Sequence, residues 1–178
     1  PGLDNITFSL GAGTPSIAVT SGLPLISEAL SIDGATGGAT RVELNGTGAG
    51  AVDGLFVTGD GSTIKSLVIN RFAQNGIQVN LGNNITVQNC FIGTNATGAA
   101  AQANGQNGVL IAASTNNLIG GAAPNLHNVI AGNGAEEIFI TGAASTGNQV
   151  QGNLIGTNAA GTAALASVGS GVSILNSP

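Results

Sequence analysis

Two nearly identical stretches of the chain decide its fold. Residues 88–98 read QNCFIGTNATG and residues 151–161 read QGNLIGTNAAG, an offset of 63 residues. At the same offset, NGVLI at 107–111 falls on SGVSI at 170–174. A long unit has therefore been copied within a chain of 178 residues, and a fixed internal period is the sequence signature of a repeat architecture.

Shorter segments recur inside this unit. The tetrapeptides GLFV, GIQV, GVLI, EIFI and GVSI begin at residues 54, 76, 108, 137 and 171, with spacings of 22, 32, 29 and 34 residues. Apolar positions at every second residue, preceded by a turn residue, predict short strands with one buried face. IKSLVI at 64–69, VQNCFI at 87–92 and VQGNLI at 150–155 predict a second series of strands.

These recurrences predict an all-β fold, a β-solenoid of about six coils. Leucine-rich repeats and propellers are excluded because their signatures are absent. Coils of a parallel β-helix stack at about 4.8 Å, so equivalent residues form ladders. We expect the aliphatic residues of the first series to face inward: Ile77, Val79, Val109, Ile111, Ile138 and Ile140. We expect asparagines at strand boundaries to form corners or ladders: Asn83, Asn84, Asn89, Asn116, Asn117, Asn128, Asn133, Asn148 and Asn153.

The extra length of the longer repeats predicts loops at one edge of the solenoid. Two such segments, 94–107 and 157–170, begin with the same TNA sequence, whereas a third, 120–127, differs in sequence. A functional face of the solenoid would be bordered by these loops. We expect one domain over 1–178, with N-terminal coils in 1–50 and regular repeats with the 63-residue period in 51–178.

The composition excludes several functions. Of the residues, 30 are glycine and only 6% are charged, and the net charge is −5. The basic residues are Arg41, Lys65 and Arg71, too few for the positive surface that nucleic-acid binding requires. The mean hydropathy of +0.35 is opposite to that of disordered chains. No apolar stretch is long enough for a membrane span.

Several runs resemble the repeats of large bacterial secreted and cell-surface proteins of the pectin-lyase-like, CSLREA-associated type. They are NGIQV at 75–79, NNITVQNCFIGTNATG at 83–98, NNLIGG at 116–121 and HNVIAGNG at 127–134. The resemblance implies a right-handed parallel β-helix that is secreted or exposed on the cell surface. It also implies that this chain is a fragment of a longer protein. Uncovered coils expose apolar core and strand edges, so we expect end-to-end self-association or an N-terminal segment over the first coil.

Many proteins of this architecture cleave polysaccharides, an activity that requires catalytic residues in the sequence. Polygalacturonase-like signatures are absent, and the densest charged neighbourhood contains Asp53, Asp60, Lys65 and Arg71. These four are the candidates for a calcium-assisted lyase site. The competing interpretation is that the aspartates cap turns and that Lys65 occupies an outward ladder position.

Other chemistry-bearing residues are isolated. Glu136 and Glu137 replace the NG found in other repeats, and together with Asp53 and Asp60 they are the candidate metal ligands, with calcium as the ion; a solvated corner is the alternative interpretation. His127 has no identifiable partner. Cys90 is expected to be an inert thiol rather than a nucleophile. The five phenylalanines are too scattered for a sugar-stacking platform unless Phe56 or Phe139 faces outward.

Two functions remain. The first is a non-catalytic structural or adhesive β-solenoid segment of an extracellular bacterial protein. The alternative is a carbohydrate-active or carbohydrate-binding β-helix of the lyase or hydrolase kind, with a groove bordered by the edge loops and a polysaccharide or surface glycan as partner. The scarcity of charged residues favours the first, because glycoside hydrolysis needs two carboxylates placed across one bond.

Overall fold

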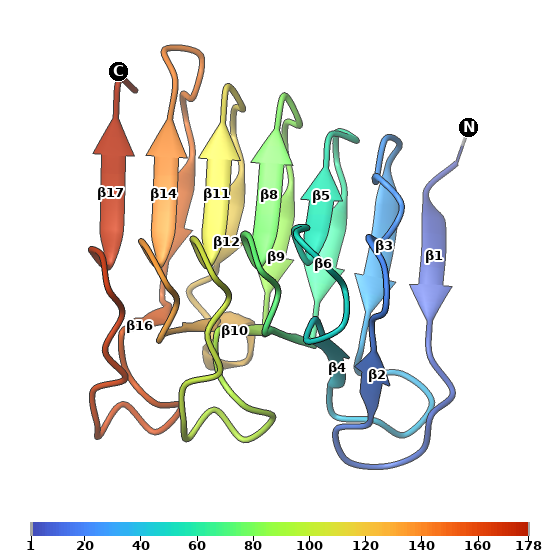
Figure 1. Ribbon diagram of the computed structural model, residues 1–178. Helices are drawn as coiled ribbons and strands as arrows, with labels where there is room; N and C mark the ends of the chain where they lie inside the picture. The colour runs from blue at the N-terminus through green and yellow to red at the C-terminus, as the bar shows by residue number, and fades with distance from the viewer. Residues whose placement is uncertain (1, 178) are drawn as a thin grey trace.

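The computed structural model describes residues 2–177 and is built almost entirely from short parallel strands that stack in three sheets (Figure 1). Pro1 and Pro178, the first and last residues of the expected 1–178 domain, lie outside the described residues. Successive strands enter successive sheets, so each circuit of the chain after the first contributes one strand to each sheet. The architecture is therefore a parallel β-helix, as the repeats predict.

Sheet 1 contains β1 (Asp4–Thr7), β3 (Leu30–Asp33), β6 (Thr63–Lys65), β9 (Thr86–Gln88), β12 (Leu118–Gly120) and β15 (Gln149–Gln151). Sheet 2 contains β2 (Ser16–Ala18), β4 (Val42–Asn45), β7 (Leu67–Asn70), β10 (Phe91–Ile92), β13 (Val129–Ile130) and β16 (Leu154–Ile155). Sheet 3 contains β5 (Leu55–Val57), β8 (Ile77–Asn80), β11 (Val109–Ala112), β14 (Ile138–Thr141) and β17 (Val172–Leu175).

The strands define six coils, numbered from the N-terminus, which confirms the expected number. Coils 2 to 6 each contain one strand of every sheet, whereas coil 1 reaches sheet 3 only through a parallel bridge between Ile26 and Val57. Residue 51, the expected start of the regular repeats, falls within coil 2, between β4 and β5.

The five tetrapeptides of the first series all lie in sheet 3, in register from β5 to β17. All six aliphatic residues expected to face inward are buried, none more than 4% exposed. Sheets 1 and 2 contribute matching inward columns, such as Ile64, Val87 and Ile119 from sheet 1. Together these side chains form one continuous hydrophobic core along the axis of the helix.

The second series was expected to form single strands, but each of its members is two strands joined by a sharp corner. β6 and β7 are separated only by Ser66, whose φ is 55°. Asn89, with φ 54°, and Gly152, with φ 67°, stand at the same corner in coils 4 and 6. A left-handed residue turns the chain from sheet 1 into sheet 2 without a loop. The corner was missed because apolar alternation continues across it.

Two of the three expected loops lie at one edge. Segments 94–107 and 157–170 connect sheet 2 to sheet 3 in coils 4 and 6, and their yellow-green and orange-red ribbons hang side by side (Figure 1). The third segment, 120–127, lies at the corner between sheets 1 and 2 and contains the 3-10 helix η1 (Pro124–Leu126). The expectation of a single loop edge is therefore wrong for that segment.

Candidate functional site

The four candidate catalytic residues lie on different parts of the coil. Asp53 directly precedes Gly54 at the start of sheet 3, Asp60 lies between β5 and β6, Lys65 ends β6 in sheet 1, and Arg71 follows β7 of sheet 2. The only ion pair within residues 2–177 joins Lys65 to Asp33, with 3.9 Å between Nζ and Oδ2. Over the same residues, no three His, Cys, Asp or Glu side chains gather as metal ligands.

Asp53 begins a ladder of side-chain amides at the corner that leads into sheet 3. Its Oδ1 accepts hydrogen bonds from the Asn75 backbone N at 2.9 Å and from Asn75 Nδ2 at 2.8 Å. Asn75 Oδ1 accepts the same pair from Asn107, at 3.2 and 2.8 Å. Asn107 Oδ1 in turn accepts from the Glu136 backbone N. Because a carboxylate is only an acceptor, Asp53 can begin this ladder without needing a partner for a donor.

Asp60 has the same role at the corner between sheets 3 and 1. Its Oδ1 accepts from the Asn83 backbone N at 2.7 Å and from Asn83 Nδ2 at 3.2 Å. Asn83 Oδ1 then accepts from the backbone N and the hydroxyl of Thr115, both at 2.8 Å. Both candidate aspartates therefore hold the backbone of the following coil.

Glu137 is fully buried, so the solvated-corner interpretation is wrong for this side chain; Glu136 is only half-buried. Glu137 Oε1 accepts from the backbone N of Gly132 at 2.7 Å and of Asn133 at 3.4 Å, and Oε2 accepts from Asn133 Nδ2 at 2.5 Å. Burial raises the pKa of this carboxyl above its ordinary value, against the opposing effect of these hydrogen bonds.

The contacts of Glu137 explain why a carboxylate stands there. Asn104 donates its backbone N and Nδ2 to Asn133 Oδ1, at 3.3 and 3.0 Å, and Asn133 donates the same two groups to Glu137. In coil 5, Gly134 follows Asn133 and its backbone N donates to Asn104 O. In coil 6, Val168 follows Ser167 and its backbone N donates to Asn133 O in the same way. Ser167 therefore occupies the ladder position of coil 6. The Glu137 carboxylate therefore replaces the missing asparagine and ends this ladder.

All nine boundary asparagines take the expected roles. Asn84, Asn89 and Asn116 have positive φ and form corners. The other six join ladders through their side chains: Asn83, Asn117, Asn128, Asn133, Asn148 and Asn153. Direct hydrogen bonds between buried amides satisfy the polar groups that the corners bring inside.

Lys65 and Cys90 take the expected structural roles. Lys65 is in register with Gln88 of the next coil, which confirms an outward ladder position. Cys90 is fully buried, and its burial raises the pKa of the thiol to about 12. A thiol that stays protonated and inaccessible does not act as a nucleophile. His127 is half-buried at the C-terminal end of η1.

The outer face of sheet 3 presents the residues best suited to a ligand. One outward row runs through Phe56, Gln78, Leu110, Phe139 and Ser173, which are in register. All five side chains are half-buried. Beside Phe56 is a cavity of about 290 Å³ that Asp53 and Gln74 also line. Phe56 and Phe139 therefore both face outward, which is the condition for a sugar-stacking surface given by the sequence.

The two edge loops have the same internal construction. Each begins with an antiparallel bridge, Thr94 to Ala101 in coil 4 and Thr157 to Ala164 in coil 6. In coil 4, Asn95 Oδ1 accepts from the backbone N of Ala99 and Ala100, and Asn158 plays the same part in coil 6.

These small hairpins also meet each other, although a whole coil lies between them. The Ala159 backbone N donates to Gly98 O at 2.9 Å. They cover a small second apolar cluster on the outer face of sheet 2, made of Val68, Phe91 and Val129 with Leu154 and Ala159.

Arg41 has a role that the sequence did not suggest. Its Nε and Nη2 donate to the O and Oδ1 of Asn89, two coils away, and its guanidinium lies 3.8 Å from the Phe91 ring centroid. A half-buried arginine that makes two hydrogen bonds and a contact with an aromatic face links the coils in a defined geometry. No local signal marks it, because Arg41 and Asn89 are 48 residues apart.

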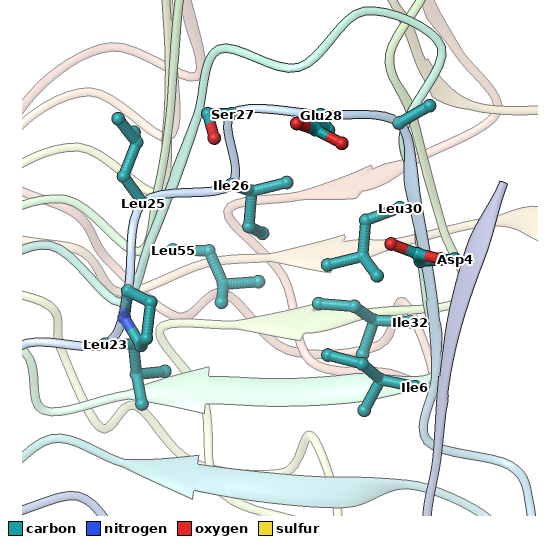
Figure 2. A pocket seen from close by; sticks show the side chains of 12 residues that line it. Asp4, Ile6, Leu23, Leu25, Ile26, Ser27, Glu28, Leu30, Ile32 and Leu55 are labelled. Atoms are coloured by element: carbon teal, nitrogen blue, oxygen red, sulfur yellow. The ribbon is translucent and has the colours of Figure 1, made fainter. Parts of the chain in front are cut away.

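A further cavity lies at the open N-terminal end of the solenoid. It has a volume of about 360 Å³. Figure 2 shows Ile6, Ile26, Leu30, Ile32 and Leu55 projecting into it, and the carboxylates of Asp4 and Glu28 at its rim. This space is the interior of coil 1, where sheet 3 has no strand. Its apolar lining continues the core rather than forming a polar site.

No protein-family model, curated protein sequence or solved structure matches this chain. In the described part of the chain, no helix has the length and apolar character needed to cross a bilayer.

Proposed function

We propose that this chain is a non-catalytic, structural or adhesive segment of an extracellular bacterial protein, of the pectin-lyase-like, CSLREA-associated repeat type. The observation on which the proposal rests is the use of its carboxylates. Asp53, Asp60 and Glu137 are three of the four candidate metal ligands, and all three accept backbone and amide hydrogen bonds from the chain. Those of Asp53 and Asp60 hold neighbouring coils together, and those of Glu137 end the Asn104–Asn133 ladder within coil 5. Catalytic carboxylates act on a bound substrate, whereas these three act on the chain itself.

Isosteric substitution tests this proposal. In the Asp53→Asn/Asp60→Asn double variant, Oδ1 can still accept the two ladder hydrogen bonds at each site. Wild type and variant would be incubated with polygalacturonate and alginate, with and without calcium, and assayed for reducing ends and unsaturated products. We expect no products from either protein and similar melting temperatures. Turnover by the wild type that disappears in the folded variant would contradict the proposal.

Carbohydrate binding without cleavage is the second candidate function, and the outward row of sheet 3 favours it. Phe56 and Phe139 stand three coils apart, about 14 Å at the spacing of stacked strands. The edge loops lead directly into β11 and β17, so they border this face. Flat aromatic faces and a nearby cavity to which Asp53 and Gln74 contribute polar groups suit an extended glycan.

A glycan array would test this second function. The Phe56→Ala/Phe139→Ala variant should lose retention on any glycan that the wild type binds. The control is Leu81→Ala, because Leu81 is 66% exposed and follows β8 at a corner, outside that row. Equal binding by all three proteins would show that the row is not the binding surface.

A further inference from the structure

The cavity beside Phe56, at the start of sheet 3, combines a carboxylate, an amide and an aromatic ring. Its lining comes from three coils: Leu23 of coil 1, Val52, Asp53 and Phe56 of coil 2, and Gln74 of coil 3. Its volume of about 290 Å³ lies near the lower end of the range for small-molecule sites. A water molecule takes up about 30 Å³ in the liquid, so the cavity has room for an organic group of several atoms.

Asp53 has one carboxylate oxygen that its ladder does not use. Both hydrogen bonds from Asn75 go to Asp53 Oδ1, and Asp53 Oδ2 accepts none from residues 2–177. The charge of this carboxylate is not compensated by the chain, because the only ion pair within the described residues joins Lys65 to Asp33. Arg71, on the segment that follows β7, is exposed and does not line the cavity. The cavity therefore contains a negative charge with an unused acceptor.

Gln74 and Phe56 add a second acceptor and an aromatic face. The Gln74 backbone N donates to Val52 O at 3.2 Å, and its Nε2 donates to Ala51 O at 3.0 Å. These two bonds hold the residue in place, and Gln74 Oε1 accepts no hydrogen bond from residues 2–177. The face of an aromatic ring carries partial negative charge and attracts cations. All three groups therefore favour the same ligand, an organic cation with N–H donors.

The outward row of sheet 3 continues from this cavity and carries no charge. Beyond Phe56 it runs through Gln78, Leu110, Phe139 and Ser173. Strands β8, β11 and β14 are paired on both sides, so this face offers side chains rather than backbone groups to a ligand. Such a face suits sugar rings, whose apolar faces pack on aromatic rings, better than a peptide that binds by adding a strand.

We propose that this cavity binds the protonated amine of a hexosamine residue within a glycan that lies along sheet 3. The inference rests on the second candidate function, carbohydrate binding, and specifies the class of sugar. An ammonium group has three donors, which suit Asp53 Oδ2 and Gln74 Oε1, and its charge suits the Phe56 ring. An N-acetylated hexosamine lacks this charge, and a uronate would bring a second carboxylate to Asp53, so both should bind less tightly.

Calorimetric titration of the 178-residue chain with glucosamine and N-acetylglucosamine oligomers of equal length tests the cavity. The buffer is mildly acidic and of low ionic strength. We expect the glucosamine oligomer to bind about tenfold more tightly, and added NaCl to reduce this preference. Asp53→Asn keeps an oxygen for the Asn75 ladder but removes the charge, so it should abolish most of the preference.

Asp60→Asn is the matched control. Asp60 begins the other ladder in the same way, and it lies beside a cavity that contains Glu28 but no aromatic ring. This variant should bind both oligomers as the wild type does. If Asp60→Asn lost the preference as Asp53→Asn does, binding would follow the net charge of the chain, and the proposal would be overturned.

A second variant keeps the test decisive if Asp53→Asn does not fold. Phe56→Leu retains an apolar side chain at a half-buried position but removes the ring face, so it should weaken binding of the glucosamine oligomer about threefold. In spectra of the wild type, the Phe56 ring resonances should shift during the same titration. Full affinity in folded Phe56→Leu or Asp53→Asn would overturn the proposal.

The remaining outcomes separate this inference from the function on which it rests. Equal binding of the two oligomers, lost in Phe56→Ala/Phe139→Ala, would overturn the amine site and leave carbohydrate binding in place. Absence of binding to any glycan would reject both. A lysine oligomer that binds more tightly than the glucosamine oligomer, in a manner that depends on Asp53, would identify a basic peptide as the occupant and overturn the assignment to a glycan.

Discussion

At the scale of single residues, the ladders allow polar side chains to be buried, because each side chain is hydrogen-bonded to residues of neighbouring coils. Asn128 is fully buried and shows the pattern completely. Its Oδ1 accepts from the Cys90 backbone N at 2.8 Å, and its Nδ2 donates to Val87 O at 2.8 Å and to Asn153 Oδ1 at 3.0 Å. Removing such a side chain leaves several buried groups without partners, which costs more than the loss of one hydrogen bond.

We therefore expect Asn128→Ala to lower the free energy of unfolding by about 2 kcal/mol or more. Asn5→Ala is the matched control, since the Asn5 side chain is exposed and donates one local hydrogen bond, to Leu3 O, and the variant should stay within about 0.5 kcal/mol of wild type. Guanidinium unfolding followed by circular dichroism measures both. Equal effects would mean that the buried ladder contributes little.

Glu137 gives the stability a dependence on pH. Burial raises the pKa of the folded-state carboxyl above its ordinary value of 4.5, so the folded chain holds the proton more strongly than the unfolded chain does. The stability linked to this group is therefore largest at pH below 4.5 and falls as pH rises through the raised pKa.

Glu137→Gln removes this titration. The difference in melting temperature, wild type minus Glu137→Gln, should decrease as the pH is raised from about 4 toward 7. The other carboxylates are common to both proteins, so their titration cancels in the difference. A difference that increases with pH would show that the hydrogen bonds from Gly132 and Asn133 outweigh burial.

At the scale of elements, the hairpins of coils 4 and 6 allow a matched comparison of two glycines. Gly98 and Gly161 occupy equivalent positions with φ of 66° and 68°. A Cβ on Gly98 would lie 2.7 Å from the Ala159 Cβ and 2.9 Å from the Phe91 ring. On Gly161, the nearest atom would be Leu154 Cδ2 at 3.6 Å.

Both alanine variants carry the strain of a left-handed backbone, about 1 kcal/mol. Gly98→Ala should lose roughly 1 kcal/mol more, because it also overpacks the contact between the hairpins. Thermal unfolding of the two variants measures the difference. Equal losses would indicate that the hairpins do not press together in solution.

The same elements show which structural features can be predicted from the sequence and which cannot. The inward columns were predictable because alternation in GIQV and GVLI reports directly on a pleated strand. The burial of Glu137 was not predictable from the sequence. It depends on the next coil, where Ser167 occupies the position at which an asparagine would continue the ladder. The hydrogen bonds that Asn70 Nδ2 donates to Glu43 Oε1 and Gln102 Oε1 give no local signal either, because only the stacking of three coils brings these residues together.

At the scale of the whole molecule, the two ends of the solenoid differ from its sides. Leu3, Ile6 and Leu25 are exposed at the first coil, and Ile174 and Leu175, 63% and 53% exposed, at the last. Strands β1 and β17 each leave one backbone edge unpaired within the described sheets. Contact of the last coil of one copy with the first coil of another is head-to-tail and does not close, so it would extend as a filament.

Sedimentation velocity of the 178-residue chain should therefore show association that grows with concentration. Ile174→Lys should suppress it by placing a charge on the last coil. Leu81→Lys makes a comparable change at a leucine that is 66% exposed on the side of the rod, and its association should match that of the wild type. A wild type that remains monomeric, or suppression by both variants, would contradict contact through the ends.

The meeting of the two hairpins also bears on how such a rod can grow during evolution. The hairpin of coil 6 finds its partner two coils back, at Gly98, because coil 5 has none. Duplication of one coil would put every later hairpin out of phase with its neighbour, whereas duplication of a pair preserves the contact. The unit copied within this chain is the two-coil block of 63 residues, and adding further blocks of two coils would preserve the contact between hairpins.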